Sequence, residues 1–222
     1  MKVKYVNKNN IETTLTRDNT YIVVAIEFNA KYVDTAKYIQ FRIIDDEKNV
    51  ILCYAEDFEI ILGEISVDWI FLNRKENDYS ILPKKIAYNS FWEDYYNGNN
   101  EAKELLNEIY IDMISKCFCE DEIKGMLNSK NANVVIYAIK ALAYITTHSY
   151  DDIILSIVED EIKSLKNYSN MQIRQILIEG YKYLSTRTGN NIENLFQNYY
   201  EHDELYCDEL DEIVGNYFLK ER

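Results

Sequence analysis

The sequence predicts an α+β protein, in which an N-terminal antiparallel β-sheet is followed by a C-terminal all-α half of helical repeats. Apolar residues alternate with a period of two up to about residue 80, as in half-buried strands. After Pro83 the period becomes 3.6, as in amphipathic helices. We therefore expect an antiparallel sheet in residues 1–80, connecting helices in residues 81–119 and helical repeats in residues 120–222.

The first part of the chain contains several predicted strands. Residues 21–28 and 38–43 each collect apolar side chains on one face, which predicts half-buried strands. A polar run follows the second of them and precedes another apolar stretch, so residues 38–54 are predicted to form a β-hairpin. Alternation continues in residues 58–62, and residues 65–72 form a further apolar run.

Two helices are predicted to connect the sheet to the repeats. Ser90 and Glu93 have the spacing of a capping box, and Gly98 supplies a stop signal for the short helix between them. Asn100 is a candidate cap for the next helix. That helix places its apolar side chains on one face: Ala102, Leu105, Leu106, Ile109 and Met113.

One apolar stripe recurs in the last part of the chain. Residues Ile173, Ile176, Leu177, Gly180 and Tyr181 are matched 37 positions later by Leu210, Ile213, Val214, Tyr217 and Phe218. Related matches 38 and 39 positions apart predict about three helix pairs, near the repeat length of roughly 40 residues in known helical repeats.

A resemblance supports this interpretation. Glu122 to Asn128, followed by Val134 to Ile145, resemble the short first helix, polar turn and A-x-x-A-L second helix of a HEAT repeat. The resemblance covers residues 120–219 and implies a stack of HEAT-like helix pairs. The alternative is an irregular helical bundle.

The chain is strongly acidic. Its 222 residues include 38 acidic and 24 basic side chains, which gives a net charge of −14. Residues 1–100 carry 16 acidic and 12 basic side chains, so most of the negative charge lies beyond them. Such a surface repels nucleic acid and accelerates encounter with a basic protein. The alternative is that the acidic residues simply keep the protein soluble.

Composition also bears on compartment and class. The chain has one proline and six glycines, which disfavours a glycine-rich phosphate loop and hence a nucleotide-binding enzyme. Residues 1–6 lack the apolar core of a secretory signal, and the most apolar stretch, Val134–Ile145, is too short to span a membrane. The four cysteines occur at spacings that suit reduced thiols. We expect a cytoplasmic protein without a membrane segment.

Residues for catalysis are scarce. The only histidines, His148 and His202, lie in no triad or H-E-x-x-H spacing. Cys117 and Cys119 are two positions apart, which places them on different faces of a helix, and no second close pair follows. We therefore expect no metal, no cofactor and no enzymatic activity.

Aromatic residues beside carboxylates are candidates for partner binding, because aromatic anchors ringed by acids suit a surface rich in Lys and Arg. The alternative is that these residues, Trp92 above all, fill the seam between sheet and helices. Glu179 is a further candidate for partner binding, because it lies on the predicted second helix of a repeat. Second helices of such repeats usually line the concave side. The predicted partner-binding residues are Trp92, Tyr95, Tyr96, Glu179, Tyr199, Tyr200, Glu201, Asp203, Glu204, Asp208, Asp211 and Glu212.

A second resemblance points to a function. Asp68–Ile70, Tyr79–Pro83 and Phe91–Gly98 resemble segments of bacterial immunity proteins from contact-dependent and other polymorphic toxin systems. The resemblance implies a cytosolic protein that binds a cognate toxin domain, often a nuclease, and blocks its active site. The expected partner is therefore a basic protein toxin domain. The alternatives are a helical-repeat scaffold or adaptor, and an enzyme with a site between sheet and helices.

Overall fold

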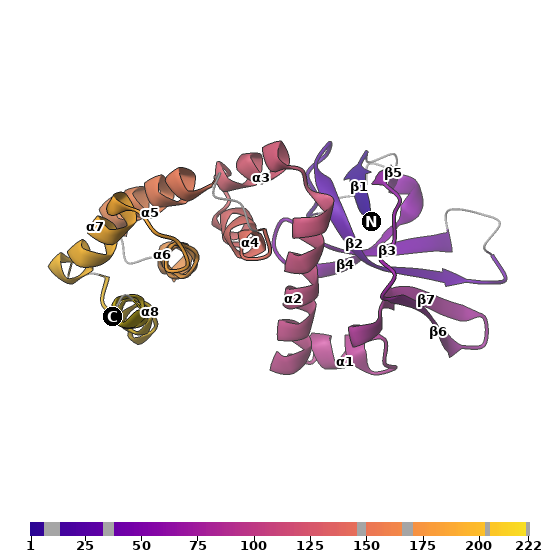
Figure 1. The fold of residues 1–222 in the computed structure, drawn as a ribbon. Helices are drawn as coiled ribbons and strands as arrows, with labels where there is room; N and C mark the ends of the chain where they lie inside the picture. The colour runs from indigo at the N-terminus through magenta and orange to yellow at the C-terminus, as the bar shows by residue number, and fades with distance from the viewer. Residues whose placement is uncertain (7–13, 33–37, 146–149, 166–170, 203–204, 221–222) are drawn as a thin grey trace. The chain divides into compact units, whose positions relative to one another are not determined.

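The computed structural model describes the chain except for residues 7–13, 33–37, 146–149, 166–170, 203–204 and 221–222. The described residues form two compact units, Met1–Cys117 and Phe118–Arg222. The first unit contains an antiparallel sheet followed by two α-helices, and the second contains only helices (Figure 1). The predicted α+β class is confirmed.

Seven strands of the first unit form one antiparallel sheet. They are β1 (Lys2–Tyr5), β2 (Thr20–Asn29), β3 (Ile39–Ile44), β4 (Val50–Tyr54), β5 (Phe58–Leu62), β6 (Trp69–Lys75) and β7 (Asp78–Pro83). The order is β4-β3-β2-β1-β5, with β7 pairing β2 and β6 pairing β7. The predicted hairpin is confirmed, since β3 and β4 pair in a register that joins Gln40 to Tyr54 and Ile44 to Val50.

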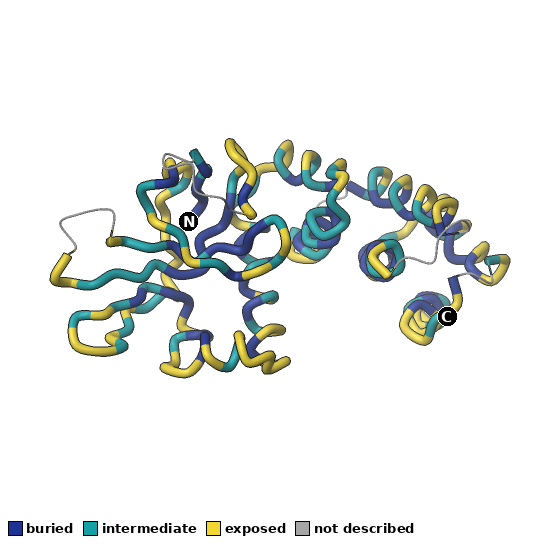
Figure 2. Tube along the Cα trace, turned by 180° about the vertical axis from the view of Figure 1, so that it is seen from behind, coloured by how far each residue is buried: buried dark blue, intermediate teal, exposed yellow. Residues whose placement is uncertain are grey.

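The centre of β2 differs from the prediction of half-buried strands. Tyr21 to Ala25 are all buried, whereas Ile26 to Asn29 are partly exposed (Figure 2). Tyr21 and Val23 belong to a core cluster on one face of the sheet. Helix α2 (Asn100–Cys117) packs on β2 and covers the other face. A strand that is covered on both faces buries consecutive residues. This explains why β2 is buried continuously at its centre and not on one face only.

The helix termini near residue 98 also differ in detail. Helix α1 (Phe91–Tyr96) follows Ser90, whose side chain caps no backbone N–H and instead donates to Asp94 Oδ2 at 3.0 Å. Ser90 has ψ of 1° rather than the extended backbone of a capping residue, so the predicted capping box does not form. Gly98 has φ of +86° after α1, as its predicted stop role requires. Asn99, not Asn100, caps α2, because its Oδ1 accepts from Ala102 N at 3.0 Å.

The second unit consists of stacked helix pairs. Its helices are α3 (Glu120–Leu127), α4 (Ala132–Leu142), α5 (Asp151–Leu165), α6 (Met171–Leu184), α7 (Asn190–Asn198) and α8 (Asp208–Lys220). The second helices of the pairs pack in series, α4 on α6 and α6 on α8, while α3 packs on α4 and α5 on α6. Phe196 of α7 stacks on Tyr217 of α8, with ring centroids 4.0 Å apart. The recurring stripe thus marks successive helices of one core.

Helices α5 and α6 lie close together at Gly180. A Cβ at this position would overlap Val158 Cγ2, whereas a Cβ at Gly215 in α8 would meet nothing within 4 Å. Gly180→Ala is therefore expected to lower the free energy of unfolding by about 1–3 kcal/mol through overpacking. Gly215→Ala, the matched control, should raise it by about 0.5–1 kcal/mol, because alanine favours helix more than glycine. Urea unfolding measures both, and a Gly180→Ala protein as stable as the control would contradict the close approach.

None of the described helices is both long enough and apolar enough to cross a membrane.

Candidate protein-binding groove

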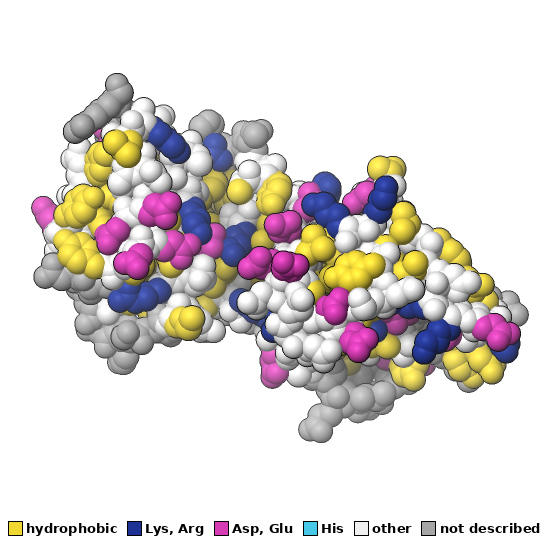
Figure 3. All heavy atoms as spheres, turned by 90° about the horizontal axis from the view of Figure 1, so that it is seen from below, with side chains coloured by type: hydrophobic (Ala, Val, Ile, Leu, Met, Phe, Trp, Pro, Cys, Tyr) yellow, Lys and Arg dark blue, Asp and Glu magenta, His cyan; other side chains and the backbone are white. Residues whose placement is uncertain are grey.

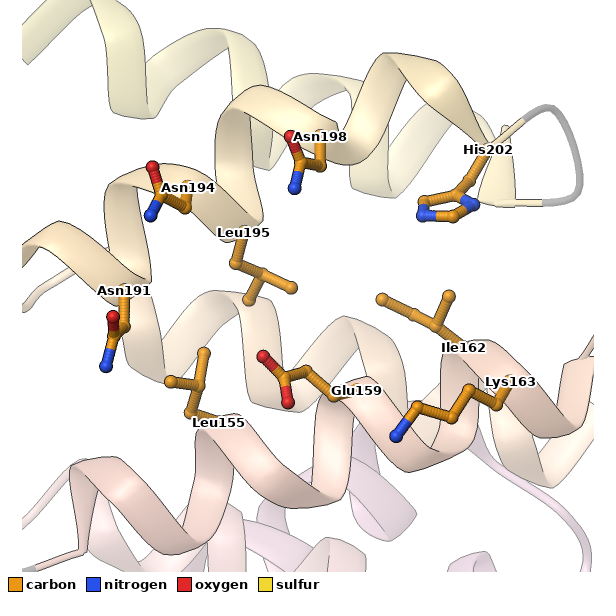
Figure 4. A pocket seen from close by; sticks show the side chains of 9 residues that line it. All are labelled: Leu155, Glu159, Ile162, Lys163, Asn191, Asn194, Leu195, Asn198 and His202. Atoms are coloured by element: carbon orange, nitrogen blue, oxygen red, sulfur yellow. The ribbon is translucent and has the colours of Figure 1, made fainter.

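A groove runs between α5 and α7 in the second unit. It has a volume of about 510 Å³ and an apolar floor formed by Leu155, Ile162 and Leu195. Figure 4 shows the side chains of the two helices pointing into the space between them. The two helices belong to successive pairs of the stack, so the groove depends on repeat packing rather than on one local segment.

The α7 wall of the groove is a row of amides. Helix α7 buries Ile192, Leu195 and Phe196 against the rest of the unit. Asn191, Asn194 and Asn198 are exposed, and all three line the groove beside Leu195. Spacings of three and four residues keep the three side chains on one face of a helix. The groove therefore presents a line of hydrogen-bond donors and acceptors.

The α5 wall carries charge. Glu159 is exposed and lines the groove with Lys163, whose Nζ lies 2.9 Å from Asp160 Oδ1. An adjoining hollow of about 480 Å³ shares Leu155 and Asn191 with the groove and extends it to the beginning of α5. Asp152 is exposed there. The exposed carboxylates of this wall are therefore Asp152 near its beginning and Glu159 near its middle, and Lys163 lies near its end.

The beginning of α5 also contains a carboxylate that is already engaged. Asp151 Oδ1 accepts a hydrogen bond from the Tyr183 hydroxyl at 2.7 Å and lies 3.7 Å from Arg187 Nε. Burial raises the pKa of Tyr183, and the bond to Asp151 raises it further. Asp151 therefore anchors α5 to α6, while the neighbouring Asp152 stays exposed to solvent.

Of the predicted residues after α7, some are internal and some are exposed. Tyr199 is fully buried, and its hydroxyl donates to Asp211 Oδ1 at 2.6 Å. This bond ties the end of α7 to α8 and removes Tyr199 as a contact residue. The other described members of this group are exposed: Tyr200, Glu201, Asp208, Asp211 and Glu212. Asp203 and Glu204 lie outside the described residues.

Glu179 does not face an open surface. It is buried on α6, accepts a hydrogen bond from Gln175 Nε2 at 2.9 Å and lies 3.2 Å from Lys140 Nζ on α4. A buried carboxylate requires such partners, because burial without them costs several kcal/mol. Glu179 therefore joins α4 to α6, in contrast to its predicted place on a partner-binding side.

Trp92, Tyr95 and Tyr96 lie on α1 in the first unit. Trp92 is buried, with the Arg42 guanidinium 4.4 Å from its ring centroid, so its interpretation as a seam residue is confirmed. The Tyr96 hydroxyl accepts from Arg42 Nη1 at 2.7 Å and donates to Val50 O at 3.1 Å. Tyr95 is half-buried, and Tyr96 keeps 55% of its surface exposed. The group fastens α1 to the sheet, and only Tyr96 offers a large free surface.

Sequence reasoning missed the amide row. The signal was present, because three asparagines at spacings of three and four mark one face of a short helix. The groove itself could not be inferred this way, since its other wall lies on α5, about 35 residues earlier. In the described part of the chain, no group of three or more His, Cys, Asp or Glu residues is arranged to hold a metal ion.

A scan against protein-family models and searches of curated proteins and of solved structures found no match to this chain. The assignment of a function therefore depends on the charge and geometry of the groove.

Proposed function

We propose that the protein is a cytoplasmic immunity protein, which binds a cognate basic toxin domain and neutralises it by occluding the toxin's active or substrate-binding surface. The observation that carries this proposal is the α5–α7 groove, with free amides on one wall and exposed carboxylates on the other. Such a groove can hold a protein segment, and its charge favours a positive one.

Exposed acids extend beyond the groove. Seven carboxylates of the second unit are exposed and have no ion-pair partner among the described residues: Asp121, Asp152, Glu159, Glu201, Asp208, Asp211 and Glu212. On the face drawn in Figure 3, Asp and Glu side chains lie among exposed apolar ones over the helical unit at the left. A toxin that binds phosphate groups, such as a nuclease, carries basic side chains that these carboxylates can pair with in place of phosphate.

The test is affinity capture from the native organism, grown dense enough for cell contact. The tagged full chain is the bait, with washes at low and at high salt and identification by mass spectrometry. We expect one stoichiometric basic protein that carries a C-terminal toxin domain. The purified toxin domain should then lose its activity when one equivalent of the protein is added. Capture of a varying set of abundant proteins, or a captured toxin that stays active, would overturn the proposal.

The apolar floor of the groove favours a second candidate, a scaffold or adaptor that holds a regulatory partner. Leu155, Ile162 and Leu195 could bind apolar side chains without any contribution from charge. Salt separates the two functions. Association of a charge-steered toxin slows as ionic strength rises, whereas docking on apolar side chains does not.

A further inference from the structure

We propose that the α5–α7 groove binds an extended, basic segment of the partner, and that Asn191, Asn194 and Asn198 hydrogen-bond the main chain of that segment. The identity of the partner rests on the proposed function, but the mode of binding is tested separately below.

The amide row is difficult to explain by the stability of α7. Four of the nine residues of this helix are asparagines, and asparagine is a poor helix former. Asn191, Asn194 and Asn198 make no side-chain hydrogen bond to any other residue that the structure describes. All three line the groove, and Figure 4 shows Asn191 pointing from α7 toward α5. Each amide therefore has a donor and an acceptor available to a ligand.

The spacing of the row suits an extended chain. At about 1.5 Å of rise per residue, the three amides lie at intervals of roughly 4.5 and 6 Å along α7. Main-chain groups on one side of an extended segment recur at roughly 6.6 Å, within reach of adjustable side chains. A bound helix would have its own main-chain groups already paired, so it would leave the amides without partners.

The groove is also long enough for such a segment. Together with the adjoining hollow it follows α5 from Asp151 to Lys163, which corresponds to roughly 18 Å of helix. An extended chain of about five or six residues covers this length. Its side chains would alternate between the apolar floor and the solvent side, where the acids of α5 lie.

Charge complementarity selects a basic segment. Asp152 and Glu159 are exposed on the α5 wall and lie roughly 10 Å apart along the helix. They face the same elongated space as the amide row. Lys or Arg side chains from the bound segment can pair with both, while an acidic segment would meet uncompensated carboxylates.

The experiment uses the full chain and two matched ligand libraries. The first contains decapeptides with Lys or Arg at every second position and apolar residues between them. The second contains peptoids with the same side chains, whose backbone nitrogens carry no hydrogen. Binding is measured by NMR from the side-chain amide signals of Asn191, Asn194 and Asn198. We expect the peptides, and not the peptoids, to shift these signals.

Substitutions make the test specific. Asn191→Ala/Asn194→Ala/Asn198→Ala should weaken peptide binding by about tenfold or more, since three hydrogen bonds are lost. The variant should stay folded, because alanine favours helix. Gln197→Ala changes an exposed residue of α7 that does not line the groove, and it should bind normally.

Two kinds of result would contradict this proposal, and each would overturn a different part of it. Equal binding of peptides and peptoids, or an unchanged affinity of the triple variant, would overturn main-chain recognition. No peptide binding at all would overturn the groove as the site, even if affinity capture still returns a toxin that the protein neutralises. The failure of this inference can therefore be distinguished from the failure of the proposed function.

Discussion

Replacing Glu201, Asp208 and Glu212 together by lysine is expected to weaken binding of the captured basic partner by about 3 kcal/mol. All three side chains are exposed, and none has an ion-pair partner among the described residues. The reversal would place positive charge opposite positive charge, so we expect slower association and a weaker dependence of the rate on salt. Calorimetry measures the affinity, and stopped-flow fluorescence measures the rate.

A control must change the net charge by the same amount elsewhere. Glu101, Glu104 and Glu108 are exposed on α2 in the first unit, and Glu101 lies in the first turn of its helix, as Asp208 does. Their triple lysine variant should keep most of the affinity. If both triple variants lose affinity equally, the effect belongs to net charge, and residues 201–212 are not the contact surface.

The second unit is expected to lose stability steeply above about pH 10, the ordinary pKa of tyrosine. Burial raises the pKa of Tyr181, Tyr183 and Tyr199 above that value, and carboxylate partners raise the last two further. Above pH 10 the unfolded chain releases these protons while the folded chain keeps them, so the free energy of unfolding falls as pH rises. Three such groups give a limiting slope of about 4 kcal/mol per pH unit.

Urea unfolding between pH 8 and pH 11.5 tests this, with tyrosinate absorbance as a direct measure of ionisation. Lysines also titrate in this range, so tyrosine-to-phenylalanine variants are needed to isolate the effect. Tyr181→Phe should reduce the slope by up to about 1.4 kcal/mol per pH unit. Gly215→Ala changes no ionisable group, so it is the control and should leave the slope unchanged. A Tyr181→Phe protein with the slope of the control would contradict the prediction.

At neutral pH, Tyr181→Phe and Tyr199→Phe should change the free energy of unfolding in opposite directions. The Tyr181 hydroxyl is buried without a hydrogen-bond partner among the described residues, whereas the Tyr199 hydroxyl bonds Asp211. Tyr181→Phe should therefore raise stability by about 1 kcal/mol, and Tyr199→Phe should lower it by about 2 kcal/mol. Equal losses would show that the two hydroxyls are in similar surroundings.

The fold was predictable where the sequence signal is local. Periods of two and 3.6 identified the hairpin β3–β4 and the helical second unit, because each period follows from backbone geometry alone. The caps near Ser90 and Asn100 were less predictable. A neighbouring Asn99 was able to take the capping role, and the choice depends on backbone angles that residue types do not fix.

The candidate site was predictable only in part. The sequence located an acidic C-terminal region, and Glu201, Asp208 and Glu212 are exposed there. It could not separate these from Glu179, whose carboxylate is buried against Lys140 of another helix, or from Asp211, which is bonded to Tyr199. Whether a carboxylate is available to a partner depends on contacts with helices that are distant along the chain.

The sequence by itself thus determined the α+β class, the helical second unit and the sign of the charge, since these follow from residue type and periodicity. Only the tertiary structure decided which strand is buried on both faces, which carboxylates are internal, and that Asn191, Asn194 and Asn198 face Glu159 across a groove. Those properties arise when α5 and α7, on successive helix pairs, are brought side by side. Packing of this kind is determined by the whole core, and no single segment encodes it.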